Sequence, residues 1–374
     1  MGRDIAEFLP GDHASGTFIG RAQSPAGPCV LLLKHGRILD LTATVASVSG
    51  AVARSQFEGG TDIGAVADGL PEGWHLLSPI DLQCIKASGV TFALSAIERV
   101  IEERARGDAS KASEIRGQLE SKVGAGIRSV VPGSADAEQL KQVLISEGMW
   151  SQYLEVAIGP DAEIFSKSPV LSSVGCGAQI GIRSDSVWNN PEPEIVLICD
   201  PDGKIVGATL GNDVNLRDFE GRSALLLSTA KDNTASCAIG PFIRLFDDGF
   251  TIDDVRQADV ELVVQGTDGY RLSGVNLMSE ISRDPLELVR QCIAQHHYPD
   301  GFVLFCGTLF APTQDRDTPG AGFTHKLGDV VTIKSERLGQ LTNTVTTSND
   351  APAWSMGIGE FVRNLSNRAV IDRI

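Results

Sequence analysis

Two glutamates are spaced so that they could share one divalent cation. Glu192 and Glu194 open an apolar run that ends at Cys199, which is typical of a buried strand. Alternate residues of a strand point to the same face, so the two carboxylates would lie side by side next to apolar surface. Buried like charges repel each other and are costly to desolvate. A divalent cation would relieve both costs, and carboxylate oxygens suit Mg²⁺, Mn²⁺ or Ca²⁺ better than Zn²⁺.

A turn after this run could supply a third ligand. In the segment 200–203, Asp-Pro-Asp-Gly, proline fits the second turn position and glycine tolerates positive φ. The chain would then return over 204–210, and such a hairpin would bring Asp213 near Glu192 and Glu194. The alternative is that these carboxylates are simply solvated at the end of a strand. We predict a metal site formed by Glu192, Glu194 and Asp213.

The residues around these carboxylates resemble the metal-site signature of the fumarylacetoacetate hydrolase superfamily. The matching stretches occur in that family's order, at 191–195, 207–214, 217–218, 231, 327–331 and 338–341. Within the superfamily, the stretches 163–167, 212–221 and 228–232 resemble the branch of 2-keto-3-deoxy sugar acid dehydratases. The resemblance implies an α+β fold, with an N-terminal α/β domain at 1–154 and a C-terminal mixed β-sandwich roll, the catalytic metal-binding domain, at 155–374.

The same resemblance implies a hydro-lyase. Its substrate would be a 2-keto-3-deoxy pentonate of the D-xylonate, L-arabinonate or D-arabinonate type, and its product 2,5-dioxopentanoate. The cofactor would be Mg²⁺, with Mn²⁺ or Ca²⁺ possible, and it would favour loss of the C3 proton by stabilising the enolate. A base, Glu163 or Lys231, would take that proton before the C4 hydroxyl leaves as water. The partner is therefore a small anionic sugar acid, and the family also suggests a homo-oligomer, a dimer or tetramer.

Each candidate for proton transfer or anion binding also has a structural interpretation. Glu163 could be an ordinary surface strand residue, and Lys231 could pair with Asp232 or with a nearby carboxylate. Lys167 could extend along the edge of the core and reach solvent, or it could equally well contact the substrate. The resemblance favours catalytic roles for Glu163 and Lys231.

The segment 87–98 resembles the stretch that carries a His–Glu pair in the C–C bond hydrolases of the superfamily. Ser95 stands where that histidine would be, and Glu98 stands where its partner would be. Serine has no nitrogen that is basic near pH 7 and cannot replace a histidine base. This departure favours a lyase over a hydrolase. The resemblance further predicts a group of substrate-binding residues on this segment and on a later Gly-Thr turn: Ser88, Gly89, Thr91, Phe92, Glu98, Gly307 and Thr308.

Two other functions remain open. The first is a C–C hydrolase or decarboxylase of acylpyruvate-like compounds, for which the missing histidine is the main objection. The second is a non-catalytic, metal-stabilised binding protein. The presence of Glu192, Glu194, Asp213 and Lys231 together argues against it, because a scaffold has no need of that combination.

Spacing of apolar residues predicts the elements that position these groups. Short strands and loops are expected over 1–80, and helices at 92–106, 110–122 and 135–147. From 155 the pattern changes to strands, which places the domain boundary near 150–157. One helix is expected to begin at Pro285, because Asp284 offers an N-cap and proline suits the first helical position.

Composition excludes some classes of partner. Over 374 residues, 42% apolar and 21% charged residues are ordinary for a globular protein. The net charge of −16 disfavours nucleic acids and anionic membranes as partners. We find no run of about 20 apolar residues and no signal peptide. The seven scattered cysteines, several in apolar runs, favour a reducing cytoplasm.

Overall fold

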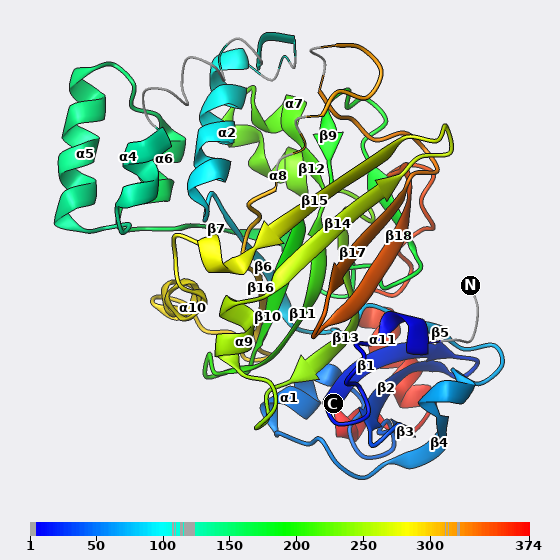
Figure 1. The fold of residues 1–374 in the computed structure, drawn as a ribbon. Coiled ribbons are helices and arrows are strands. Elements are labelled where there is room, and N and C mark those ends of the chain that lie inside the picture. Colours follow the sequence, from blue (N-terminus) through cyan, green and yellow to red (C-terminus); the bar gives the residue numbers. More distant parts are fainter. Residues whose placement is uncertain are drawn as a thin grey trace.

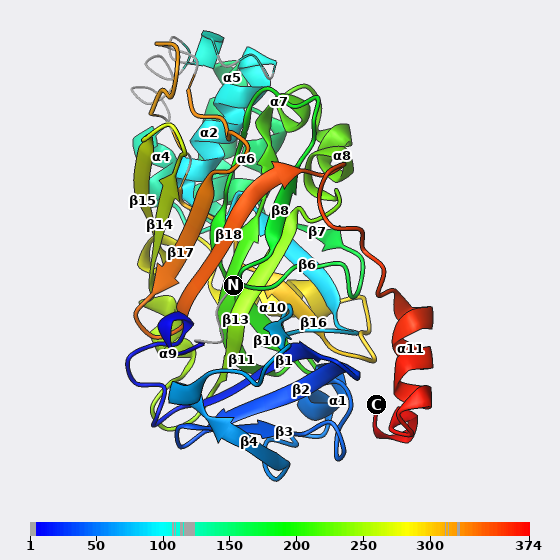
Figure 2. The same cartoon turned by 90° about the vertical axis from the view of Figure 1, so that its right-hand side faces the viewer.

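Two β-sheets pack face to face in the computed structural model, and a group of helices lies at one end of them (Figure 1). The structure describes residues 5–374 except 107, 109, 113, 114, 116–123, 311, 313, 320 and 321. Figure 2 shows the same arrangement from the side, with the C-terminal helix beside the N-terminal strands.

The larger sheet has eleven strands in the order β4-β3-β2-β1-β13-β11-β10-β16-β6-β7, with β5 paired to β1. All neighbours are antiparallel except β16 and β6, which are parallel. The strands are β1 Thr17–Ser24, β2 Gly27–Lys34, β3 Arg37–Asp40, β4 Thr61–Ala65, β5 His75–Leu76, β6 Cys84–Gly89, β7 Glu163–Ser168, β10 Pro193–Cys199, β11 Ile205–Asp213, β13 Cys237–Leu245 and β16 Phe302–Phe305.

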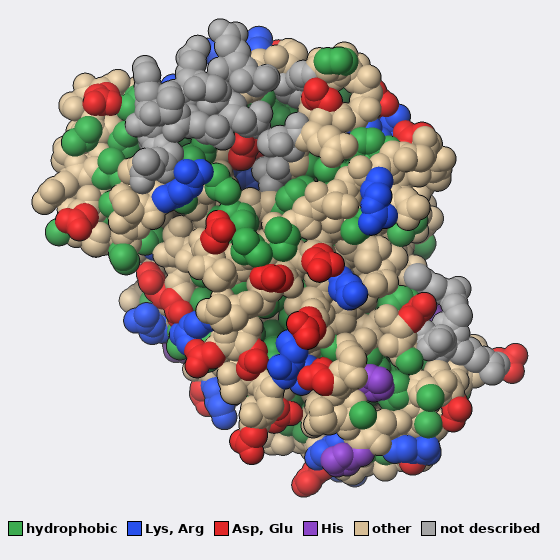
Figure 3. All heavy atoms as spheres, viewed as in Figure 1, with side chains coloured by type: hydrophobic (Ala, Val, Ile, Leu, Met, Phe, Trp, Pro, Cys, Tyr) green, Lys and Arg blue, Asp and Glu red, His purple; other side chains and the backbone are tan. Residues whose placement is uncertain are grey.

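The smaller sheet has five strands in the order β15-β14-β17-β18-β8, and β9 pairs with β12 in a short ribbon. The strands are β8 Gln179–Ile182, β9 Asn189–Asn190, β12 Asn215–Leu216, β14 Asp259–Gln265, β15 Arg271–Leu277, β17 Val330–Ser335 and β18 Gly339–Thr347. Strand β14 alternates buried and more exposed residues, because only one of its faces covers the core. Figure 3 shows acidic and basic side chains interspersed on the face of the molecule that carries β14 and β15.

Strand β10 is buried along its whole length. Leu197 belongs to the core between the two sheets, where Leu262 and Ile333 of the smaller sheet also lie. Val196 and Ile198 belong to a second core on the opposite face of the larger sheet. Burial on both faces explains why this strand reads as a continuous apolar run rather than an alternating one.

Helices gather around α2 (Ala93–Ala105) at one end of the sheets, next to α4 (Gly124–Ser129), α5 (Ala135–Ser146) and α6 (Gln152–Ile158) (Figure 1). Ala96, Val100 and Ile101 of α2 are buried in a shared apolar cluster, as their helical spacing predicts. The predicted helices at 92–106 and 135–147 are confirmed, and most of the one predicted at 110–122 lies outside the described residues.

The remaining helices are shorter. They are α1 Val48–Ala53, α7 Arg217–Glu220, α8 Leu227–Lys231, α9 Ile252–Arg256, α10 Pro285–Ile293 and α11 Ile358–Asn367, with 3₁₀ turns at Ala6–Phe8, Val66–Asp68, Ala224–Leu226, Met278–Glu280 and Ile371–Arg373. Helix α10 begins as predicted: the Asp284 side chain accepts a hydrogen bond from the Leu286 N–H, and Pro285 occupies the first turn. Among the described helices, none combines the length and apolar character needed to cross a membrane.

Strands from both ends of the chain share the larger sheet. β1 pairs with β13, and β6 pairs with β16. The C-terminal segment also returns to the N-terminal strands, where Arg368 Nη1 donates to the Pro28 carbonyl at 2.6 Å. The α+β fold class is therefore confirmed, whereas the division into 1–154 and 155–374 stays a prediction.

The central hairpin depends on a glycine at a close approach between strands. A Cβ at Gly211 would lie 2.3 Å from Phe305 Cε1 and 2.5 Å from Val196 Cγ2. Gly211→Ala should therefore lower the free energy of unfolding by about 1–3 kcal/mol, because the core must shift to admit one methyl group. Denaturant unfolding measures this change. Gly11→Ala is the control, since no atom lies within 4 Å of its Cβ position. Equal stability of the two variants would contradict the close packing.

Candidate active site

The three predicted metal ligands meet at the open end of the β10–β11 hairpin. Asp213 ends β11, and its N–H donates to the carbonyl of Glu192 at 3.1 Å. The register pairs Glu194 with Gly211. One carboxylate oxygen from each of Glu192, Glu194 and Asp213 lies within 4.8 Å of the others, and all three residues are buried. The hairpin predicted from the turn thus brings the three carboxylates together.

The electrostatics of this cluster suit a divalent cation. Burial raises the pKa of Glu194 well above its usual range, and the negative charges of Asp213 and Glu192 raise it further. Burial alone would raise the pKa of Asp213. The positive charges of the nearby Lys167 and Lys231 outweigh this effect and lower the pKa of that carboxyl. The site therefore contains a carboxylate that cannot ionise easily without more positive charge. Three hard oxygen donors in this state fit Mg²⁺ or a similar ion.

Two lysines contact the cluster. Lys231 Nζ donates to Asp213 Oδ2 at 3.0 Å and also forms an ion pair with Glu192 Oε2. Lys167 Nζ lies 2.7 Å from Asp213 Oδ1 and is fully buried. The interpretation of Lys167 as a side chain that extends to solvent is therefore wrong, because its ammonium group is needed as a counter-ion inside the protein. Lys231 forms ion pairs with nearby carboxylates, as one alternative had it, and these are the predicted metal ligands Glu192 and Asp213, not Asp232.

Glu163 begins β7 and faces the same cavity. Its backbone pairs with Gly89, and a Cβ on Gly89 would lie 2.0 Å from Glu163 Oε2. The absence of a side chain at Gly89 therefore makes room for the carboxyl group. Burial raises the pKa of Glu163, although Arg99 and Lys231 oppose the shift. In the part of the chain that the structure describes, no ion pair or hydrogen bond engages this carboxyl, so it is available to a ligand.

These groups line a cavity of about 20 Å³. A space of that size admits one water molecule or ion. The described residues that form the wall are Ser88, Gly89, Val90, Ser95, Arg99, Glu163, Phe165, Glu192, Glu194, Asp213, Glu220, Lys231, Gly307 and Thr308.

The predicted substrate-binding residues divide into two groups. Ser88, Gly89, Gly307 and Thr308 line the cavity. The N–H of Gly307 donates to Glu194 Oε2 at 2.6 Å, so this backbone group orients a predicted metal ligand.

The other three predicted contacts lie outside the cavity wall. The Thr91 hydroxyl donates to the Cys306 carbonyl at 2.7 Å, and Phe92 is buried in the core between the sheets. The Glu98 carboxylate lies 3.1 Å from Arg217 Nη2. Thr91 and Phe92 precede helix α2, and Glu98 lies on the helix with its carboxylate directed to Arg217.

Ser95 lies in the cavity wall, but its hydroxyl is engaged at the start of α2. It donates to the Phe92 carbonyl at 2.8 Å and accepts from the Phe92 N–H at 3.2 Å. This capping arrangement leaves Ser95 no role as a base. None of the described residues that line the cavity is a histidine.

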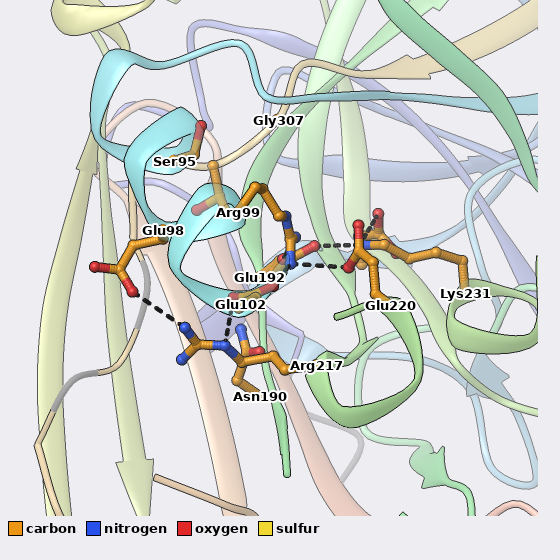
Figure 4. A network of polar contacts seen from close by, with 12 residues as sticks. Ser95, Glu98, Arg99, Glu102, Asn190, Glu192, Arg217, Glu220, Lys231 and Gly307 are labelled. Carbon is orange, nitrogen blue, oxygen red and sulfur yellow. Dashed lines mark hydrogen bonds and ion pairs between the residues drawn. The ribbon is translucent and has the colours of Figure 1, made fainter. Parts of the chain in front are cut away.

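Sequence reasoning missed Arg99 and Glu220. Figure 4 shows the Arg99 guanidinium between helix α2 and the carboxylates. Its Nη2 lies 2.7 Å from Glu192 Oε1, and its Nη1 lies 2.7 Å from Glu102 Oε2 and 2.8 Å from Glu220 Oε2. The spacing of Ser95 and Arg99, one helical turn apart, could have indicated that both face the site. Glu220 lies within the matched stretch 212–221 but was not singled out.

Comparison with known proteins confirms the resemblance. Residues 200–346 match the family described as fumarylacetoacetate (FAA) hydrolase C-terminal. A probable 2-keto-3-deoxyxylonate dehydratase of Haloferax volcanii is 32% identical over 199 residues, which is 53% of this chain and 65% of the relative. A 2-dehydro-3-deoxy-D-arabinonate dehydratase of Saccharolobus solfataricus is 32% identical over 183 residues, which is 49% of this chain and 58% of the relative. The matched segments thus cover less than two thirds of each relative.

Solved structures show the same fold. A 2-keto-3-deoxy-D-arabinonate dehydratase complexed with magnesium and 2,5-dioxopentanoate superposes with a TM-score of 0.62. The comparison covers 88% of this chain and 99% of that chain, at 22% identity. A fumarylacetoacetate hydrolase of Exiguobacterium antarcticum superposes with a TM-score of 0.55, over 88% of this chain and 99% of that chain at 19% identity. These similarities agree with the α+β fold class, whereas the assignment of a β-sandwich roll to 155–374 alone stays a prediction.

Removing one carboxylate should impair metal binding. Glu192→Gln and Glu194→Gln should each weaken Mg²⁺ binding by at least about tenfold, because loss of even an outer-shell partner costs 10–100-fold. Calorimetry measures the affinity, and the rise in melting temperature on adding Mg²⁺ gives a second readout. Glu155→Gln, which changes a half-buried carboxylate paired with Lys141, is the matched control. Unchanged Mg²⁺ binding in both site variants would show that the ion lies elsewhere.

Proposed function

We propose that this chain is a Mg²⁺-dependent dehydratase of a 2-keto-3-deoxy pentonate. The observation that carries the proposal is the composition of one cavity. It holds three clustered carboxylates, the Lys231 ammonium paired with two of them, and a Glu163 carboxyl that no ion pair or hydrogen bond of the described residues engages, and none of its described residues is a histidine. A water-activating hydrolase of this superfamily would need a base in the place of Ser95. A lyase does not, because water leaves in the reaction and none has to be activated.

The relatives support the choice of substrate. The two curated proteins are named for the 2-keto-3-deoxy derivatives of xylonate and arabinonate, and the solved dehydratase was complexed with magnesium and 2,5-dioxopentanoate. We extend the proposal to substrates of the D-xylonate, L-arabinonate or D-arabinonate type. It also includes Mn²⁺ or Ca²⁺ as substitutes for Mg²⁺, and a cytoplasmic homo-oligomer, a dimer or tetramer.

Glu192, Glu194 and Asp213 would hold the cation. When bound, it would supply positive charge that stabilises an enolate oxygen at C2 and so acidifies the C3 proton. The ammonium group of Lys231 would attract the anionic end of the substrate. It is well suited to this, because Asp213, Glu192 and Glu220 outweigh burial and raise the pKa of Lys231, which keeps it charged.

Glu163 would move the proton. Its raised pKa makes it a stronger base toward a carbon acid than an ordinary glutamate. The C3–H bond breaks as the proton passes to Glu163, and the electron pair enters the enolate. The C4–O bond then breaks, and the protonated carboxyl returns its proton to the departing hydroxyl, which leaves as water. Tautomerisation of the unsaturated product yields 2,5-dioxopentanoate.

Product analysis tests the proposal directly. With Mg²⁺ present, a panel of 2-keto-3-deoxy pentonates should give 2,5-dioxopentanoate as the main product, followed by NMR. Pyruvate or another C–C cleavage product as the main product would overturn the dehydratase assignment. Metal binding with no conversion of any pentonate would instead favour the non-catalytic binding protein.

Variants at the proton-transfer site should separate catalysis from metal binding. Glu163→Gln and Lys231→Met should each lower turnover by roughly 10²–10⁴-fold, as expected for a positioned acid, base or charge. Gly89→Ala should also lower turnover, because its methyl group would displace the Glu163 carboxyl. Calorimetry should show Mg²⁺ binding retained in all three. Turnover within a few-fold of wild type would make the residue structural, and joint loss of metal binding would assign it to the metal site.

A further inference from the structure

Arg99 contacts the metal cluster from helix α2, and the proposed mechanism gives it no role. Its side chain is mostly buried, with 12% of its surface exposed. Nη2 donates to Glu192 Oε1 at 2.7 Å, while Nη1 lies 2.7 Å from Glu102 Oε2 and 2.8 Å from Glu220 Oε2. Figure 4 shows the guanidinium reaching from α2 toward these groups. One cationic side chain thus binds a predicted metal ligand and two carboxyl groups of the helices.

The helices hold this guanidinium in a fixed position. Glu102, which pairs with Arg99, lies 2.6 Å from Arg217 Nε through its other oxygen. The Arg217 guanidinium lies over the Trp188 ring, 4.3 Å from its centroid. A planar guanidinium that two carboxyl groups already hold loses little further freedom when it binds a third group. Arg99 is therefore a fixed donor toward Glu192.

Each of the three predicted metal ligands has one oxygen held by a donor of the protein. These oxygens and their donors are Glu192 Oε1 with Arg99 Nη2 at 2.7 Å, Glu194 Oε2 with the N–H of Gly307 at 2.6 Å, and Asp213 Oδ1 with Lys167 Nζ at 2.7 Å. An oxygen that already contacts a positively polarised donor is a poorer metal ligand, because the donor and the cation repel each other. Each carboxylate is thereby left to present its other oxygen.

The remaining oxygens of two ligands face a common point. Lys231 Nζ lies 3.0 Å from Asp213 Oδ2 and is also paired with Glu192 Oε2. One ammonium group reaches both oxygens, so positive charge is favoured between them. A divalent cation at this point would bind each carboxylate through a single oxygen. Three such ligands fill half of the octahedral shell that Mg²⁺ demands and leave the other half for substrate and water.

We infer that Arg99 is a positioning residue that restricts Glu192 to one metal-binding oxygen and so selects a small octahedral cation over Ca²⁺. This inference rests on the cation site of the proposed function and names what sets the choice of metal there. Ca²⁺ takes about six to eight oxygens and often binds a carboxylate through both of its oxygens. With Arg99 on Oε1, Glu192 does not supply that second oxygen. Mg²⁺ needs only one oxygen from each carboxylate, so it loses nothing.

Calorimetry on the metal-free wild-type protein tests the selectivity. Mg²⁺ should bind at least about tenfold more tightly than Ca²⁺, because the ligand set lacks the additional oxygens that Ca²⁺ requires. The rise in melting temperature with each ion gives a second readout. Equal or tighter binding of Ca²⁺ by wild type would overturn the inference without any variant.

Arg99→Met assigns the selectivity to this residue. Without the donor on Oε1, Glu192 can bind a cation through both oxygens, and the preference for Mg²⁺ over Ca²⁺ should fall by at least about tenfold. The ratio of the two affinities separates this effect from the loss of one positive charge, which strengthens binding of both divalent ions alike. Arg99→Lys keeps the charge but lacks the fork that reaches three carboxyl groups, so its ratio should be intermediate. Arg104→Met, at an exposed position of the same helix, is the matched control and should keep the wild-type ratio.

A wild-type ratio in Arg99→Met would overturn the inference and leave Arg99 a structural residue of α2, even where the melting temperature falls. If Arg99→Met does not fold, Arg99→Lys decides: an intermediate ratio supports the inference, and an unchanged ratio overturns it.

Failure of the inference is distinguishable from failure of the proposed function. Pentonate dehydration by the Mg²⁺-loaded wild type leaves that function standing when the selectivity is absent. Selectivity that depends on Arg99 leaves the inference standing when no pentonate is dehydrated. If wild type binds no divalent cation, both proposals fail.

Discussion

The concentration of buried negative charge at the end of the β10–β11 hairpin governs the structure around it. Glu192, Glu194 and Asp213 crowd one small volume, and each would be costly to ionise there alone. Lys167 and Lys231 bring positive charge to this volume from β7 and α8, and Arg99 brings it from α2. One strand and two helices therefore each contribute a cation that offsets the charge of the cluster.

The carboxylates of the metal cluster and the side chains of Arg99 and Glu220 come from different parts of the fold. The carboxylates sit on or next to β10 and β11, which lie in the middle of the larger sheet with core on both faces. The cationic side chain of Arg99 and the carboxylate of Glu220 come from α2 and α7, at the end of the sheets. Hydrogen bonds to neighbouring strands hold the hairpin that carries the carboxylates, whereas packing of the helices holds Arg99 and Glu220.

Arg99 joins these two parts. It contacts Glu192 beside the sheet, and it contacts Glu102 and Glu220 on the helices. A change of charge at the hairpin would therefore alter the ion pairs that α2 and α7 make with one guanidinium group. Burial raises the pKa of Glu220 to about 7, against the opposing charges of Arg99 and Lys231, so the network contains a carboxyl that is sensitive to its neighbours.

The local sequence pattern was sufficient to predict the features that lie within one element or one turn. The i, i+2 spacing of Glu192 and Glu194 and the turn at 200–203 predicted the hairpin that brings Asp213 to them, because strand direction and turn geometry are set by adjacent residues. The start of α10 at Pro285 followed from its cap in the same way. The family resemblance added the fold class and the candidate roles of Glu163 and Lys231.

Only the tertiary structure decided which distant segments meet. The pairing of β1 with β13 and of β6 with β16 joins strands far apart in the chain, and no local pattern specifies it. The same holds for the burial of Lys167, for which the sequence left both solvent exposure and a substrate contact open, and for the position of Glu98 away from the cavity while Arg99 enters it. The direction of a side chain within a helix follows from the sequence of that helix. The partner that this helix face contacts is set by the packing of the whole chain, because burial and charge compensation depend on all elements at once.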